Sequence, residues 1–153
     1  MSIKKRVNKI ESDILSTKLS KSEKQKNLHD FLLNSLDFPE DIKYILEKHN
    51  IVIEFGADYI LNNAFNNRKY ETVKVLIQHI NDVKYIFNSV IIEDVIYTYS
   101  LYQDKTFYEI FKMLIEKYHI INFAYKKTLN HNFIKNVVNL IILCINNGCN
   151  INY

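Results

Sequence analysis

The chain has 153 residues, of which 48% are hydrophobic and 24% are charged, and its net charge is +3. This composition supports a folded core and excludes an intrinsically disordered protein. Two Gly, one Pro and no Trp are too few turn formers for a sandwich or barrel of short strands. We therefore expect an all-α protein, and the apolar periodicity along the chain favours helices throughout.

The first 26 residues are the most basic part of the chain, with eight Lys and Arg against three Asp and Glu. A stripe of aliphatic side chains at helical spacing predicts a helix over residues 2–19. We interpret residues 1–26 as a basic N-terminal helix that caps the first unit. The alternative is binding to nucleic acid or to an anionic membrane through this segment. The basic residues that would carry that alternative are Lys4, Lys5, Arg6 and Lys9.

The next stretch carries two helix-start signals. Ser20 and Glu23 have the spacing of a capping box, which opens a short helix, and a separate two-turn helix is expected around Leu28. Asp37 is the predicted cap of a further helix over residues 39–48, with its proline in the first turn.

The remaining chain reads as pairs of short helices. Residues 57–84 form two helices joined by a polar turn at 66–68. Residues 90–102 predict another first helix, and Thr106 is the predicted cap of the helix that follows it. Gly148 closes the last helix and is expected in the left-handed conformation. Two runs of β-branched residues, each of three, are treated as loop or helix-end segments rather than strands.

The second helices of these pairs are similar to one another when aligned at their ends. Aligning His49, Ile80, Tyr118 and Gly148 gives separations of 31, 38 and 30 residues. Periods of this length are typical of a solenoid, in which each hairpin buries its apolar face against its neighbours. The longer third unit predicts a longer first helix or a bulged turn.

The repeat resembles the ankyrin repeat family. The ending INNGCNIN at 145–152 is similar to the family's L-x-x-G-A-D-V-N, with Cys for Ala and Asn for Asp. The central unit matches the family pattern A-A-x-x-G-H-x-E-I-V-K-L-L-L at Ala64, Glu71, Val73, Lys74, Leu76 and Ile77. The resemblance covers residues 27–153, in units of about 27–53, 54–84, 85–122 and 123–153. It implies a solenoid of about four ankyrin-like hairpins.

The chain departs from that family at several positions. The family's T-P-L-H-x-A start is nearly erased, Arg68 stands where the family has Gly between the helices, and the Gly after the second helix is kept only at Gly148. The alternative is a compact non-repeat bundle that resembles the Bcl-2-like helical host-response modulators of large DNA viruses. Such a bundle would contain one apolar helix that is packed on all sides, and residues 137–145 are the best candidate for it.

No motif in the sequence predicts catalysis, a metal or a cofactor. The histidines lack metal-ligand spacing, and two glycines cannot form a phosphate loop. Cys144 and Cys149 are expected to be reduced thiols in a cytoplasmic compartment, and the apolar surroundings of Cys144 predict a raised pKa and an inert thiol. The sequence shows neither a membrane span nor a secretory signal. Ile, Asn, Lys and Tyr, whose codons are AT-rich, are heavily used, and this bias together with eroded repeats resembles proteins of large DNA viruses and host-associated bacteria.

The expected function is protein–protein interaction, and the protein is not expected to be an enzyme. The ankyrin resemblance implies that the turn tips and first helices bind the partner. We also expect self-association through the C-terminal repeat, because Ile141 and Ile145 belong to an end unit without a following repeat. The candidate partner-binding residues are Phe55, Asp58, Lys84, Tyr85, Asn88, Phe123, Tyr125 and Lys126.

Overall fold

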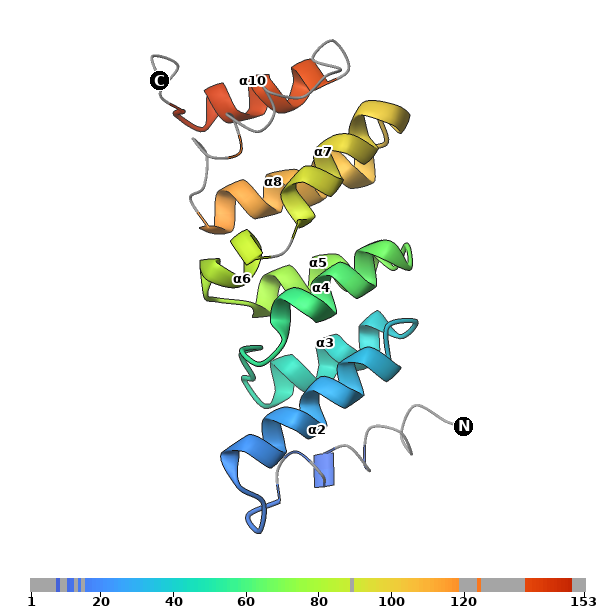
Figure 1. Ribbon diagram of the computed structural model, residues 1–153, viewed down its shortest axis with the longest axis vertical. Coiled ribbons are helices and arrows are strands. Elements are labelled where there is room, and N and C mark those ends of the chain that lie inside the picture. The colour runs from blue at the N-terminus through green and yellow to red at the C-terminus, as the bar shows by residue number, and fades with distance from the viewer. Residues whose placement is uncertain are drawn as a thin grey trace. The chain divides into compact units, whose positions relative to one another are not determined.

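The computed structural model describes residues 8, 11–12, 14, 16–88, 90–118, 124 and 137–149, and these residues form helices and turns without a strand. The all-α prediction is therefore confirmed for this part of the chain (Figure 1). The helices are α2 (Lys21–Asn34), α3 (Pro39–Lys48), α4 (Ala57–Asn66), α5 (Tyr70–His79), α6 (Val83–Asn88), α7 (Ile91–Tyr102), α8 (Lys105–Tyr118) and α10 (Val138–Asn146).

The chain divides into two compact units, unit 1 (Met1–Tyr85) and unit 2 (Ile86–Tyr153). In unit 1, α4 packs against α5, α2 lies beside α4 and α3 lies beside α5 (Figure 1). First helices therefore contact first helices, and second helices contact second helices. The fully buried aliphatic side chains of this unit include Leu32, Ile42, Ile45, Leu46, Ile60, Leu61, Leu76 and Ile77.

Two hydrogen bonds connect the successive hairpins of unit 1 at opposite ends. The buried Thr72 hydroxyl, in the first turn of α5, donates to the Leu36 carbonyl after α2 at 2.7 Å. The Ile53 amide, in the loop after α3, donates to the carbonyl of His79 at the end of α5 at 3.0 Å. These bonds satisfy loop groups that burial would otherwise leave unpaired, and they hold the hairpins in register.

Unit 2 contains a longer hairpin. Helix α7 has 12 residues and α8 has 14, compared with 10 each in α4 and α5. This difference accounts for part of the longer third unit. Helix α7 packs on α8, and α10 also packs on α8. Phe111 of α8 is fully buried, and each buried aliphatic or aromatic side chain of this kind contributes about 1.5–3 kcal/mol.

The helix starts in unit 1 follow the sequence signals in part. The capping box is confirmed, because the Ser20 hydroxyl accepts from the Glu23 amide and the Glu23 carboxylate accepts from the Ser20 amide. The predicted break between two helices here is wrong, since α2 runs unbroken to Asn34. The predicted cap Asp37 is also wrong: Phe38 occupies the N-cap of α3 without a side-chain bond, and Asp37 forms an ion pair with Lys69.

Two predictions for the later chain also need correction. Asp104, not Thr106, caps α8, because its carboxylate accepts from the Thr106 amide at 2.7 Å. Residues 84–88, expected as an exposed turn, lie in the short helix α6, where Ile86 is fully buried. The β-branched runs behave as predicted: residues 51–53 are a loop, and residues 90–92 form the start of α7.

Left-handed residues follow four of the described helices, and one of them, Gln103 at the C-cap of α7, has a φ angle of 50°. Asn50, Arg68 and Gly148 have φ angles of 49°, 59° and 85°. At Arg68 the amides make the Schellman pattern, with Arg68 N–H donating to the Phe65 carbonyl and Lys69 N–H donating to the Ala64 carbonyl, both at 2.9 Å. The left-handed prediction for Gly148 is confirmed. The ankyrin resemblance expects Gly at position 68, and Arg68 adopts the left-handed conformation that Gly favours.

Substitution of Arg68 by Gly is expected to stabilise unit 1 by about 1 kcal/mol, because the left-handed conformation is strained for a residue with a Cβ atom. Thermal or urea unfolding measures the gain. The matched control is Arg68→Ala, which keeps a Cβ atom and should give no comparable gain. Equal stabilisation by Ala and Gly would show that the long exposed side chain, and not the backbone conformation, is unfavourable.

Candidate interaction surface

Three ring side chains form a surface cluster between α2 and α4, which we call the aromatic cluster: His29, Phe55 and Tyr59. The His29 ring lies 5.5 Å from the Phe55 ring, edge to face, and 6.1 Å from the Tyr59 ring in a stacked arrangement. Phe55 is 58% exposed and Tyr59 is 57% exposed. Large rings with this exposure present apolar area to solvent that a partner could bury.

A glycine positions the cluster. Gly56 precedes α4 with φ +63°, and a Cβ atom there would lie 2.7 Å from Cδ2 and 2.8 Å from Nε2 of His29. The backbone can approach the His29 ring this closely only because Gly56 has no side chain. The approach places Phe55 on one side of the glycine and the first turn of α4, with Tyr59, on the other.

Three acidic residues lie next to these rings, two as sequence neighbours and one in contact with His29. Glu54 precedes Phe55, Asp58 precedes Tyr59, and Asp30 Oδ1 lies 3.6 Å from Nδ1 of His29. Asp58 lies in the first turn of α4, where a negative charge interacts favourably with the helix dipole. Glu54 and Asp58 form no ion pair with any residue that the structure describes.

The structure brings only part of the predicted partner-binding set to this cluster. Phe55 and Asp58 belong to it or flank it. Lys84 and Tyr85 lie in α6, where Lys84 Nζ is 2.8 Å from an Asp82 carboxylate oxygen and 4.8 Å from the Tyr85 ring centroid. Asn88 is the last residue of α6. The other predicted members, Phe123, Tyr125 and Lys126, lie outside the described residues.

Two members of the cluster were not predicted. Tyr59 was expected only as one of the residues of a first helix; it lies off the buried stripe of α4, since its neighbours one turn later are Asn62 and Asn63, and it is exposed. His29 is a single histidine within a mostly polar helix and carries no signal by itself. The isolated Gly56 was the available indication, because a glycine that begins a helix marks a close backbone approach or a left-handed turn.

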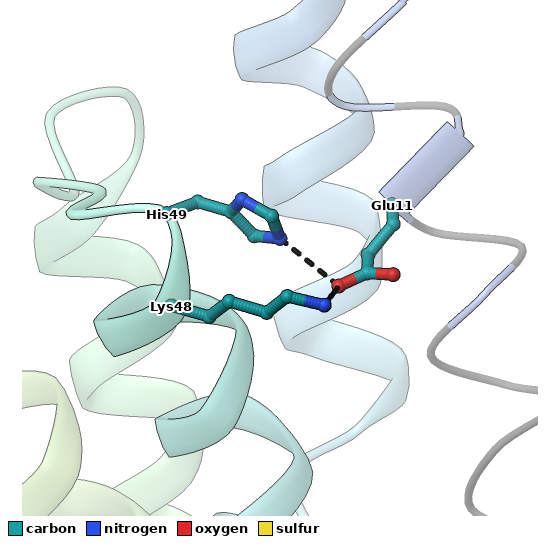
Figure 2. A network of polar contacts seen from close by, with 3 residues as sticks. All are labelled: Glu11, Lys48 and His49. Carbon is teal, nitrogen blue, oxygen red and sulfur yellow. Dashed lines mark hydrogen bonds and ion pairs between the residues drawn. The ribbon is translucent and has the colours of Figure 1, made fainter.

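The basic N-terminal segment is held to α3 through one carboxylate. Glu11 Oε1 accepts from Lys48 Nζ at 2.7 Å and lies 3.0 Å from His49 Nε2 (Figure 2). Ile14, one turn later, is buried. These contacts join two described residues of the segment to unit 1, and the cap over residues 1–26 stays a prediction. Lys4, Lys5, Arg6 and Lys9 lie outside the described residues, so nucleic-acid or membrane binding through them stays a prediction.

The contacts of Glu11 shift two pKa values. The hydrogen bond from Lys48, followed by the one with His49, lowers the pKa of Glu11 below its ordinary value of 4.5. The same hydrogen bond, with a smaller contribution from Tyr44, raises the pKa of Lys48. Both groups are therefore charged at neutral pH, and the ion pair depends on both charges.

The described residues offer little for catalysis. No group of three or more His, Cys, Asp or Glu among them could hold a metal ion. Burial raises the pKa of the Cys144 thiol to about 12, with a smaller contribution from Cys149, so Cys144 is protonated and unreactive at neutral pH. No described helix is long and apolar enough to cross a membrane.

An open groove among the described residues of unit 2 has a volume of about 370 Å³. Asn139 Nδ2 donates to the Tyr99 hydroxyl at 3.2 Å within it. The lining holds no pair of carboxylates and no histidine, so it offers no general acid–base pair. The lining residues are Tyr99, Gln103, Lys105, Tyr108, Asn139 and Ile142.

A second exposed apolar set lies on α10. Val138, Ile142 and Ile145 share one face at helical spacing, and each is 46–47% exposed. Helix α10, the candidate for an apolar helix packed on all sides, therefore has one half-exposed face. Its opposite face buries Leu140 and Cys144.

Comparisons of the chain with protein-family models, with curated proteins and with solved structures found no match. The functional proposals below therefore depend on the residues and contacts of this chain.

Replacing Glu11 by Gln is expected to lower the melting temperature at neutral pH, because it removes the charge that pairs with Lys48 and His49. The lowered pKa of Glu11 means that its contribution is present above 4.5 and is lost as the pH falls through the folded-state pKa. The melting difference between wild type and variant should therefore shrink and disappear on acidification. A difference that is independent of pH would contradict the role of the ionised carboxylate.

Proposed function

We propose that this chain is a protein-interaction module whose binding surface is the aromatic cluster in unit 1. The single observation that carries the proposal is the exposure of Phe55 and Tyr59, each above half, around a partly buried His29. Large aromatic side chains are over-represented among the residues that dominate binding energy at protein interfaces.

The setting of the cluster supports this role. The rings come from two different segments, α2 and the start of α4, and the buried core beneath them fixes their spacing. A pre-organised ring surface loses little side-chain entropy on binding, because Phe and Tyr have only two side-chain torsions. The surface includes a turn and two first helices, the elements that the sequence resemblance implies for partner binding.

The double substitution Phe55→Ala and Tyr59→Ala should weaken binding to captured partner proteins by about tenfold or more, as expected for interface hot spots. The immobilised chain would be used to capture proteins from a cell lysate, with the retained proteins quantified by mass spectrometry. Circular dichroism would confirm that the variant keeps its helix content, since both side chains are exposed.

The matched control is Tyr102→Ala in unit 2, which removes a ring that is 69% exposed but lies outside the cluster. Proteins retained by the wild type and by the control, but lost by the double variant, would support the proposal. Equal retention by all three chains would contradict it.

Self-association through α10 is a second candidate function. The observation that favours it is the stripe of Val138, Ile142 and Ile145 on a helix whose sequence contains no charged residue. Two copies of this face could pack together without bringing like charges into contact. Three half-exposed aliphatic side chains bury less area than a standard interface, so the expected dimer is weak.

Analytical ultracentrifugation over a range of protein concentrations tests this second candidate. The wild type should show a weak, concentration-dependent dimer, and Ile142→Lys should remain monomeric because the lysine places a charge on the apolar face. The control substitution is Leu101→Lys on α7, which also removes an exposed aliphatic side chain. A wild type that is monomeric at the highest concentration would contradict self-association.

A further inference from the structure

The segment that carries the aromatic cluster is acidic within a basic chain. Residues 27–66 contain seven Asp and Glu and two Lys, although the whole chain has a net charge of +3. One of the two lysines, Lys48, is already paired with Glu11. The first turns of α2 carry Lys21, Lys24 and Lys26 outside this segment, so the negative charge lies with the acids next to the rings, of which Glu54 and Asp58 have no ion-pair partner among the described residues.

Exposed aromatic rings are binding sites for cations. A Lys or Arg side chain within about 6 Å of a ring centroid is attracted to the electrons of the ring face. The chain itself forms this contact elsewhere, with Lys48 at 5.1 Å from the Tyr44 ring and Lys117 at 5.5 Å from the Tyr118 ring. Phe55 and Tyr59 have no such contact with a described residue.

The helices that carry the cluster also hold two hydrogen-bond acceptors without donors. The buried atoms Gln25 Oε1 of α2 and Asn62 Oδ1 of α4 have no hydrogen-bond partner among the described residues. Gln25 precedes His29 by one turn, and Asn62 follows Tyr59 by one turn, so they lie on neighbouring parts of the same helix faces. Buried acceptors of this kind are rare in native proteins.

We propose that the aromatic cluster binds a cationic segment of the partner protein that contains Arg or Lys. This inference rests on the proposed function and adds the chemistry of the partner. The side chains of the segment stack on Phe55 and Tyr59, and the carboxylates of Glu54, Asp58 and Asp30 pair with its charges. Arginine fits best, because its planar guanidinium stacks on rings and carries five donors. The same carboxylates repel phosphate, which disfavours nucleic acid and anionic membranes at this surface.

The test uses three capped peptides of six identical residues (arginine, lysine and glutamate) titrated into the isotope-labelled full chain. Amide chemical shifts at residues 54–59 report binding. The arginine peptide should produce the largest saturable shifts, the lysine peptide smaller ones and the glutamate peptide none. Added salt should weaken binding, because exposed ion pairs are screened at high ionic strength.

Two sets of variants separate the contributions of rings and charges. Tyr59→Ala, and separately the pair Glu54→Gln and Asp58→Asn, should each weaken arginine-peptide binding by about threefold or more. The matched control is the pair Glu40→Gln and Glu47→Gln, which makes the same charge change with exposed residues of α3. The control pair should bind the peptide nearly as tightly as the wild type.

The outcomes distinguish this inference from the proposed function. The proposal of a cationic partner would be overturned if the arginine and glutamate peptides gave equal shifts, or if the control pair weakened binding as much as the pair Glu54→Gln and Asp58→Asn. Either result would leave the proposed function standing if lysate capture still depended on Phe55 and Tyr59. A further variant replaces Lys4, Lys5, Arg6 and Lys9 by Gln. If the arginine peptide binds this variant but not the wild type, the surface binds the chain's own N-terminus, and the assignment to a separate partner is overturned.

Discussion

The close approach of the Gly56 backbone to the His29 ring sets the geometry of the candidate surface. Helix α4 can begin against α2 only where no Cβ atom intervenes, and the left-handed φ of Gly56 turns the chain at that point. Phe55 and Tyr59 consequently lie on either side of His29, with more than half of each ring exposed. A larger residue at position 56 would have to displace the His29 ring or the start of α4. The contact between Gly56 and His29 therefore determines both the packing of α4 on α2 and the shape of the candidate surface.

The rest of unit 1 supports that contact through burial and a few polar bonds. The aliphatic side chains beneath α2 and α4 fix the helices, and the Thr72 hydroxyl and Ile53 amide hold the second helices and loops in register. The Glu11 carboxylate holds the N-terminal segment against the end of α3 (Figure 2). Because the core is filled by aliphatic contacts, the exposed rings are not needed to complete it, and they are free to take the binding role proposed for them.

Sequence periodicity predicted the helices better than it predicted the site. The pairs α4–α5 and α7–α8 lie where the apolar pattern placed them, because burial of one face determines a helix locally. The sequence predicted two short helices where the structure has the single helix α2. A capping box marks where a helix begins but does not show how far the helix continues. The surface was only half predicted: Phe55 and Asp58 were identified from a turn, but Tyr59, which lies off the buried stripe of α4, was not singled out. Which apolar residue faces solvent depends on the neighbouring hairpin, which local spacing does not specify.

The most direct test of this account is a nuclear Overhauser spectrum of the folded full chain, focused on the ring protons of His29. The account predicts cross-peaks from the His29 ring to the Gly56 α-protons and to the rings of Phe55 and Tyr59. It also predicts that Gly56→Ala weakens or removes these cross-peaks while the resonances of unit 2 stay unchanged. A folded chain without the His29 cross-peaks, or a Gly56→Ala chain that retains all of them, would contradict the account.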